Sequence, residues 1–207
     1  MTEKKVLRVF LAGEGSNELG AHVDHPSYRD STKIGVLEAL LRRVEPAGWE
    51  VGGAVQWKGI RKFRVGAAAH ADTHNVMGAA NDAREAGCQV LAFTRDRDND
   101  MSRPAAIAEG ITRATIAMTS VGIVGGCACP TLEGWLLALS GKTGTERMSP
   151  TKASDELVKA GVRSKDGAAM VAVVENANLE AVPRDAGSLL CWLEQARSTL
   201  SPPGDGL

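Results

Sequence analysis

Three short groups of acidic residues each follow an apolar run that favours a buried strand. The runs VLRVFLA, VLAFT and VGIVGGCA are followed by GEGSNE, RDRDND and CPTLEGW, respectively. In a parallel α/β sheet the carboxyl ends of the strands open onto one crevice, so we expect these acidic side chains to meet there. The residues are Glu14, Glu18, Asp96, Asp98, Asp100 and Glu133.

Six carboxylates in one crevice would repel one another. Two of them about 4 Å apart cost about 4 kcal/mol at an effective dielectric constant of about 20. A divalent cation removes that cost, and carboxylate oxygens are ligands that suit Mg²⁺ and Mn²⁺. The sequence therefore predicts a site for Mg²⁺, or for Mn²⁺ in its place.

Each acidic group taken alone has a simpler explanation. Glu14, Glu18 and Glu133 could stabilise the N-termini of helices, and the aspartates of RDRDND could form a solvated turn. Their joint placement at three strand ends favours a site over these explanations. Gly13 and Gly15 would allow the backbone to approach closely there.

The densest basic stretch is WKGIRKFR, in which cations alternate with Trp57 and Phe63. Cations beside aromatic side chains can follow a nucleic-acid backbone and stack a base. The alternative is a solvated loop or strand edge with both aromatic side chains in the core. Because the net charge of the chain is −1, a nucleic-acid contact must be local or shared with a partner. The candidate nucleic-acid-binding residues are Lys58, Arg61, Lys62 and Arg64.

Strand-like and helix-like patterns alternate along the first part of the chain, which predicts an α/β fold with a mostly parallel sheet flanked by helices. After Gly141 the pattern changes to two or three helices, one of which begins at Ser149-Pro150. We therefore expect a metal-binding catalytic domain over residues 1–140 and a helical C-terminal extension with a disordered tail over residues 141–207. The expected strands lie near 6–11, 51–57, 89–94 and 119–124, and the expected helices near 33–45, 73–86, 102–114 and 185–199.

Several other motifs fail on inspection. GEGSNELG has Glu18 where a dinucleotide fingerprint needs glycine, GKTGT lacks the first glycine of a phosphate-binding loop, and DRDND lacks the glycine and glutamate of an EF-hand loop. HADTH would place two imidazoles on one helical face. A zinc site from His70, His74, Cys127 and Cys129 is conceivable, but surface histidines and small buried cysteines explain these residues better.

Composition indicates an ordinary globular protein, with 43% hydrophobic and 24% charged residues in 207. No apolar stretch reaches the length of a membrane span, and the N-terminus has no long apolar core of a signal peptide. The four cysteines show no disulfide spacing. We therefore expect a cytoplasmic protein with reduced thiols and no membrane partner.

The acidic motifs resemble a known family. Glu14 in a G-E-G-x-x-E context after the first strand, followed by a later strand that ends in Asp96-x-Asp98, is similar to the Toprim domain of topoisomerases, primases and several nucleases. PTLEGWLLA around Glu133 resembles an element of small Toprim-related proteins, some of them encoded near ATPases in bacterial defence or mobile loci. The resemblance covers roughly residues 5–140. Arg95 and Arg97 depart from the pattern, and they could face outward or neutralise phosphate.

The resemblance implies a Mg²⁺-dependent nuclease. Asp96 and Asp98 would hold the metal with Asp100 as an outer ligand, and Glu14 would bind metal or act as a general acid or base. Glu18 and Glu133 would complete a second metal position, and two cations about 4 Å apart suit phosphoryl displacement. The sequence does not separate DNA from RNA as the substrate.

Two other functions stay open at this point. The same crevice could serve a phosphatase or nucleotidyl transferase acting on a small phosphate ester. The chain could also be a regulatory partner of an ATPase that keeps only a relic of the metal site. The complete acidic set argues against a relic, whereas the near-neutral net charge argues for a partner.

Overall fold

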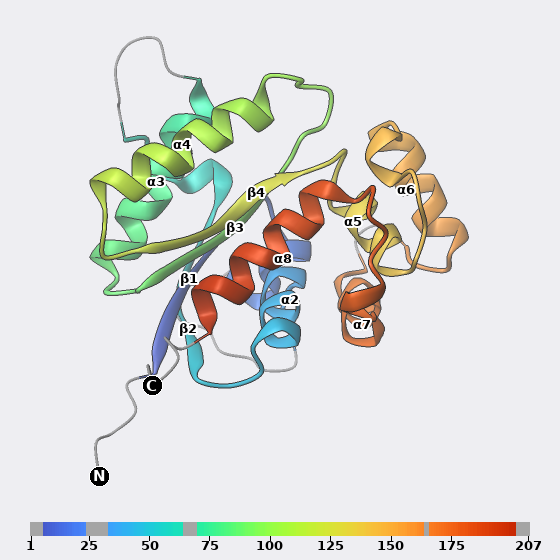
Figure 1. The fold of residues 1–207 in the computed structure, drawn as a ribbon, viewed down its shortest axis with the longest axis horizontal. Helices are drawn as coiled ribbons and strands as arrows, with labels where there is room; N and C mark the ends of the chain where they lie inside the picture. The colour runs from blue at the N-terminus through green and yellow to red at the C-terminus, as the bar shows by residue number, and fades with distance from the viewer. Residues whose placement is uncertain (1–5, 24–32, 64–69, 164–165, 202–207) are drawn as a thin grey trace.

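The protein is described from a computed structural model, which covers residues 6–23, 33–63, 70–163 and 166–201 (Figure 1). A parallel sheet of four strands in the order β2-β1-β3-β4 lies between two layers of helices, which confirms the α/β fold expected from the sequence. The strands are β1 (Leu7–Gly13), β2 (Trp49–Gln56), β3 (Val90–Asp96) and β4 (Gly122–Ala128).

Alternating side chains along the two central strands divide the core into two clusters. One cluster contains Val9 and Leu11 of β1, and the other contains their neighbours Phe10 and Ala12. This alternation follows from the two-residue period of a strand, and both clusters are apolar because helices cover both faces of a parallel sheet. The α-helices are α1 (Ser16–Leu19), α2 (Val36–Val44), α3 (Ala71–Glu85), α4 (Arg103–Ala117), α5 (Leu132–Leu139), α6 (Pro150–Lys159), α7 (Gly167–Asn176) and α8 (Gly187–Leu200).

The expected elements agree with the observed ones except for the start of the fourth strand. The strand expected near 119–124 begins only at Gly122, because the N–H of Val121 donates to the carbonyl of Met118 in a turn (3.0 Å). From Gly122 onward β4 pairs with β3, and it extends to Ala128. Short 3-10 turns occur at Gly20–Val23, Trp57–Gly59, Thr145–Arg147 and Leu179–Ala181.

The C-terminal helices belong to the helical layer that covers one face of the sheet. The indole of Trp192 in α8 donates to the carbonyl of Phe93 (3.0 Å), and Gln195 accepts the N–H of Gly125 on the outer strand (3.0 Å). Residues of α6, α7 and α8 belong to the same apolar cluster as α2 and α5. The segment expected as an extension therefore shares a core with the sheet, while its predicted disordered tail at 202–207 lies outside the described residues.

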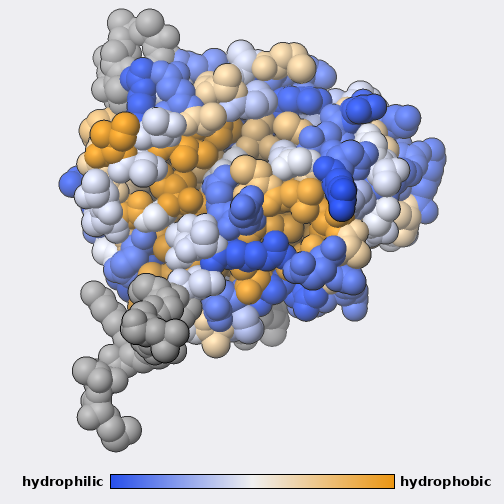
Figure 2. Space-filling model, in the orientation of Figure 1, coloured by the Kyte–Doolittle hydropathy of each residue, from blue (hydrophilic) through white to orange (hydrophobic). Residues whose placement is uncertain are grey.

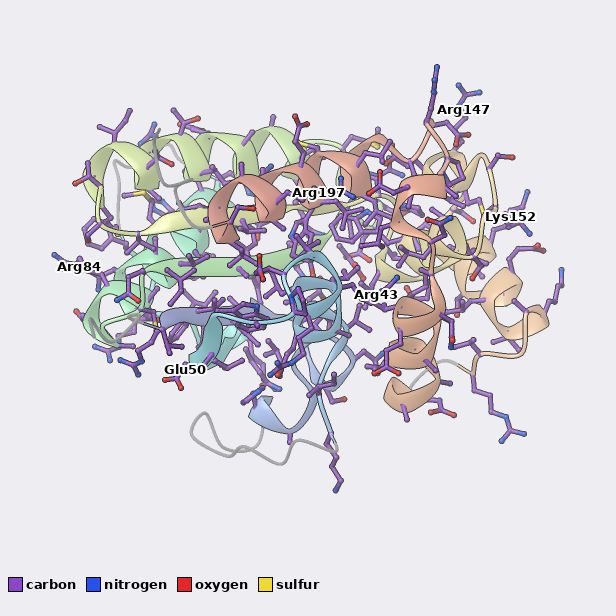
Figure 3. The ribbon with its side chains drawn as sticks, turned by 60° about the horizontal axis from the view of Figure 1, so that its bottom comes forward. Arg43, Glu50, Arg84, Arg147, Lys152 and Arg197 are labelled. Atoms are coloured by element: carbon purple, nitrogen blue, oxygen red, sulfur yellow. The ribbon has the colours of Figure 1, made fainter. Side chains whose placement is uncertain are left out.

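The helical layer is also held together by a polar contact, and apolar side chains are visible at one edge of the sheet. Arg43 of α2 extends toward the C-terminal end of α7, where its guanidinium donates to the carbonyl of Ala177 (2.6 Å; Figure 3). Apolar side chains are visible in Figure 2 between α4 and α8, where β4 forms the edge of the sheet. Across the described segments, no helix combines the length and apolar character needed to cross a bilayer.

The strand order reverses beside β1. The chain passes from β1 to β2 on one side and then crosses to β3 on the other side of β1. In open α/β sheets such a reversal leaves a crevice at the carboxyl ends of the two strands, where ligands usually bind. Here those strands end at Gly13 and Asp96, directly beside the predicted acidic residues.

Candidate active site

The ends of β1 and β3 are joined by Glu14. Its Oε1 accepts the backbone N–H of Asp96, the last residue of β3 (3.0 Å). The guanidinium of Arg95 also pairs with this carboxylate. Glu14 therefore stands at the point where the strand order reverses, with a cation on one side and Asp96 on the other.

Glu18 is folded back over the end of β1 by α1. Its Oε2 accepts the N–H of Gly15 (3.0 Å), and only 7% of the residue is exposed. A Cβ on Gly13 would lie 2.7 Å from the Glu18 Cβ, and a Cβ on Gly35 would lie 2.1 Å from the Glu18 carbonyl oxygen. The position of Glu18 thus requires glycine at both places, one of which the sequence had indicated.

Asp96 connects this region to the start of α5. Its Oδ1 accepts the N–H of Leu132 (2.8 Å), and Glu133 lies in the first turn of the same helix. Thr131, which precedes Leu132, is only 5% exposed, and its hydroxyl oxygen has no hydrogen-bond partner within the described residues. This hydroxyl belongs to the residue before the one whose N–H binds Asp96, so it is a candidate neutral oxygen ligand.

The electrostatics tie four carboxyl groups together. Burial and, to a smaller extent, the charges of Glu14, Glu18 and Glu133 together raise the pKa of Asp96 to about 8. Burial likewise raises the pKa of Glu18 to about 7, with smaller contributions from Glu14 and Glu133 and with opposition from backbone hydrogen bonds. We call Glu14, Glu18, Asp96 and Glu133 the carboxylate cluster.

Asp98 and Asp100 were predicted as ligands, but they lie apart from this cluster and face Arg103. The Arg103 Nη1 donates to Asp98 Oδ2 (2.9 Å) and to the carbonyl of Asp96 (2.6 Å), and its Nη2 lies 3.7 Å from Asp100 Oδ2. The hydroxyl of Ser102 and then Arg103 and a neighbouring histidine lower the pKa of Asp100. These contacts compete with metal binding, so the ligand role of the two aspartates stays a prediction.

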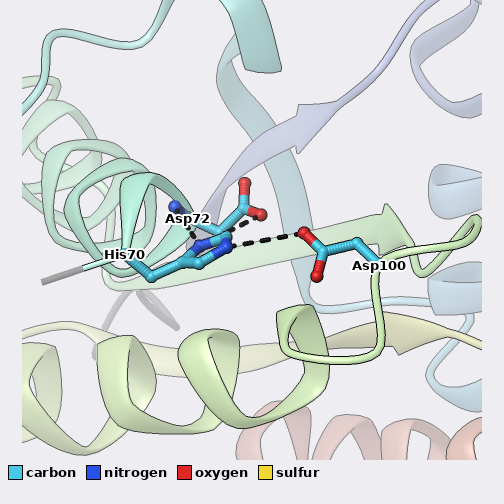
Figure 4. Close-up of side chains that lie close together, drawn as sticks. All are labelled: His70, Asp72 and Asp100. Atoms are coloured by element: carbon cyan, nitrogen blue, oxygen red, sulfur yellow. Dashed lines mark hydrogen bonds and ion pairs between the residues drawn. The ribbon is translucent and has the colours of Figure 1, made fainter.

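Asp100 also belongs to a trio with His70 and Asp72 (Figure 4). Among the described residues, this is the one set of three potential ligands whose atoms all lie within 4.8 Å of one another. Asp72, however, accepts Arg103 Nε and Trp57 Nε1, both at 3.0 Å. Because Arg103 already pairs with both carboxylates, the trio fits an ion-pair network better than a cation site.

The histidines differ from their expected arrangement. His70 is the N-cap of α3, where its Nδ1 accepts the N–H of Asp72 (3.1 Å), so the two imidazoles of HADTH do not share a helical face. His74 Nδ1 instead lies 2.8 Å from the carbonyl oxygen of Phe63. No three of the residues considered for zinc form a compact set within the described chain.

The sequence did not indicate Asp72 and Arg103 as residues of this region, because an acid in the first turn of a helix and an arginine after a loop are common without function.

The basic stretch is divided between two places. Lys58 and Lys62 line a pocket of about 410 Å³, whereas Arg61 points to Glu85 of α3 (3.8 Å) and Arg64 lies outside the described residues. Trp57 is buried as one alternative expected, but Phe63 is 44% exposed and does not lie in the core. The pocket is lined by Glu14, Trp57, Lys58, Ile60, Lys62, Asn75 and Arg95.

Three further exposed cations lie in two parts of the molecule. Arg84 lies at one end of the molecule in Figure 3, whereas Arg147 and Lys152 lie at the other end. The cations that line the pocket beside Glu14 are Lys58, Lys62 and Arg95.

Comparisons of the chain with family models, with curated proteins and with solved structures each gave no match. The Toprim resemblance therefore still depends on the short acidic motifs alone, and the site is interpreted from its own chemistry.

Proposed function

We propose that this protein hydrolyses phosphodiester bonds of nucleic acid with the help of Mg²⁺ or Mn²⁺ bound at the carboxylate cluster. The observation that carries the proposal is the meeting of Glu14, Glu18, Asp96 and Glu133 at the carboxyl ends of β1 and β3 and the start of α5. Groups that repel one another in a half-buried crevice gain most from a shared cation.

Each member of the cluster has a distinct place in this proposal. Asp96, Glu18 and Glu133 would hold the cation, and the unpaired hydroxyl of Thr131 would supply a neutral oxygen beside them. A bound cation of this kind activates water and stabilises negative charge on phosphate oxygens. The cluster is not yet compact enough to form a trio within 4.8 Å, so we expect binding to draw its side chains together.

Glu14 is suited to proton transfer because it belongs to both the cluster and the pocket. A carboxylate there can take a proton from an attacking water or give one to the leaving oxygen. Arg95, which pairs with Glu14, would hold that carboxylate in place and face the phosphate. The lysines at the pocket then favour a phosphate ester as the substrate over an uncharged molecule.

The likeness of the acidic motifs to Toprim nucleases supports a nucleic-acid substrate, and the local character of the positive charge supports a partner that adds further contacts. A small phosphate ester is the second candidate substrate, because a pocket of about 410 Å³ has the size of a small-molecule site.

The test incubates the purified chain with labelled DNA and RNA in EDTA, Mg²⁺ and Mn²⁺. We expect cleavage with a cation, no cleavage in EDTA, and loss of activity in Asp96→Asn. Glu14→Gln should lose at least about a hundredfold in rate, a typical contribution of general acid–base catalysis. Arg61→Gln is the matched control, because this residue points away from the pocket to Glu85.

Three results would contradict the proposal. The first is an absence of cleavage of DNA, RNA and a chromogenic phosphodiester with either cation. The second is cleavage that persists unchanged in Asp96→Asn purified in the same way, because a contaminating nuclease would then be its source. The third is a Glu14→Gln rate equal to that of the unmodified chain.

A further inference from the structure

We infer that the pocket beside Glu14 holds a single nucleotide of the substrate strand, with its base against Trp57 and Asn75 and its phosphate at Lys58 and Lys62. This inference names the part of the substrate that the chain recognises, and it rests on the proposed function. It concerns binding and can be measured without catalysis.

Two residues that line the pocket carry buried polar atoms without a hydrogen-bond partner in the part of the chain that the structure describes. Asn75 is 9% exposed, and its Oδ1 has no hydrogen-bond partner in the described chain. The Nε of Arg95 is also buried and has no hydrogen-bond partner within the described segments, although it forms an ion pair with Asp72 at 3.7 Å. Two of the five such atoms among the described residues thus belong to residues that line one pocket. Buried polar groups are normally paired, so these two indicate a ligand that supplies the missing partners.

The walls of the pocket suit a flat aromatic group. The Trp57 indole is fixed by its hydrogen bond to Asp72 (3.0 Å) and by contact with Phe93, whose ring centroid lies 5.5 Å away. Ile60 adds an apolar surface beside it. Trp57 is only 6% exposed, and the Arg95 guanidinium lies over its ring (5.9 Å), so a base would contact the exposed part of the indole together with Ile60. An asparagine amide pairs with the donor and acceptor edge of a base such as adenine.

Positive charge lies at the same pocket. Lys58 and Lys62 are exposed, and neither forms an ion pair with a carboxylate of the described residues. The segment between them is pressed against α3, because a Cβ on Gly78 would lie 2.1 Å from the carbonyl oxygen of Arg61. The backbone between the two lysines is therefore held against α3, and their exposed ammonium groups are available for a phosphate at the pocket.

The pocket also adjoins the proposed catalytic groups. Glu14 lines it and at the same time accepts the N–H of Asp96 in the carboxylate cluster (3.0 Å). A nucleotide bound with its base toward Asn75 would place its phosphate between the lysines and Glu14. The occupant is thus the nucleotide attached to the scissile phosphate, and about 410 Å³ lies within the range of small-ligand sites.

The experiment measures binding in EDTA by isothermal titration calorimetry with AMP, GMP, CMP, UMP and inorganic phosphate. We expect the nucleotides to bind more tightly than inorganic phosphate. The double variant Lys58→Gln/Lys62→Gln should lose at least about tenfold in nucleotide affinity, which corresponds to 1.4 kcal/mol. Arg61→Gln is the control of matched type and should stay within about twofold of the unmodified chain.

Asn75→Ala separates base recognition from phosphate binding. It should weaken the nucleotides by about tenfold and leave inorganic phosphate unchanged, as expected for the loss of a hydrogen-bonding edge. Its thermal melting is compared with that of the unmodified chain, and the surface lysine variants keep the test valid if Asn75→Ala does not fold. An octanucleotide should compete with AMP, because both would occupy the pocket.

The inference is overturned if no mononucleotide binds, if inorganic phosphate binds equally well, or if the double lysine variant binds like Arg61→Gln. Simultaneous binding of AMP and the octanucleotide would also overturn it, since the pocket would then lie off the path of the strand. Binding of nucleotides by a chain that cleaves nothing would contradict the proposed function alone. Cleavage of nucleic acid by a chain that binds no mononucleotide would contradict this inference alone.

Discussion

Replacing Glu18 by glutamine should stabilise the metal-free protein above neutral pH and reduce the pH dependence of its stability. Burial raises the pKa of Glu18 from 4.5 to about 7. Between these two values the unfolded chain releases its proton while the folded chain keeps it, so the free energy of unfolding falls as the pH rises. The stabilisation is complete below pH 4.5 and is lost as the pH passes through 7.

The size of the effect follows from the same two values. One pH unit corresponds to about 1.36 kcal/mol, so the rise from 4.5 to about 7 costs the ionised protein about 3 kcal/mol. Asp96 acts in the same direction between 3.8 and about 8. Because the two groups repel each other, their contributions are not additive. Glutamine at position 18 can still accept the N–H of Gly15, so the replacement removes the charge and keeps the bond.

Urea unfolding in EDTA between about pH 5 and 9 measures this difference. Glu50→Gln on β2 is the matched control, because its side chain is 41% exposed (Figure 3). We expect the unmodified chain and Glu50→Gln to lose stability together as the pH rises, and Glu18→Gln to lose about 3 kcal/mol less. If the free energy of unfolding depends on pH in the same way in all three chains, burial does not raise the pKa of Glu18. The argument for a cation at the carboxylate cluster then fails.

Three further outcomes are expected. Binding of Mg²⁺ at pH 7 should release about one proton or more, because Asp96 is still protonated at this pH. Calorimetry in buffers of different ionisation enthalpy measures the number of protons released. An equal number in Asp96→Asn would contradict this prediction. Gly13→Ala should lower the free energy of unfolding by about 1–3 kcal/mol and weaken Mg²⁺ binding, because its Cβ meets Glu18 at 2.7 Å. Gly15→Ala, whose Cβ would have its nearest neighbour at 4.0 Å, should change both much less, and equal effects would refute the steric argument. Trp192→Phe should cost about 1–3 kcal/mol through the lost hydrogen bond to β3; an unchanged urea midpoint would mean that α8 does not support the sheet.

The sequence by itself determined the fold class and the strand ends of the candidate site. Apolar runs bounded by glycine and acidic residues can be recognised from local patterning, and parallel strands necessarily bring their carboxyl ends to one edge. For this reason the sequence alone predicts that Glu14 and Asp96 lie close together. The glycine at position 13 was also identified, because its role depends on local geometry that only glycine tolerates.

Only the tertiary structure decided which acidic side chains share a site. Asp96, Asp98 and Asp100 are neighbours in sequence, yet Asp96 turns to α5 while the other two turn to Arg103 of α4. This division depends on where α4 and α5 pack, and no local pattern encodes it. Electrostatic pairing is decided by distances of a few ångströms between distant segments, so the same rule holds for the pairing of Arg95 with Glu14.

The pocket was likewise beyond the sequence. Asn75 lies on α3, Lys58 and Lys62 follow β2, and Glu14 follows β1. Three segments that are separate in the sequence therefore line one pocket. The basic stretch indicated positive charge, but only the packing of its segment on Gly78 turned Arg61 away and left the two lysines at the pocket. Local sequence patterning therefore determined the strands and their acidic ends, whereas the packing of helices on the sheet decided which side chains meet, because such contacts join residues far apart in the chain.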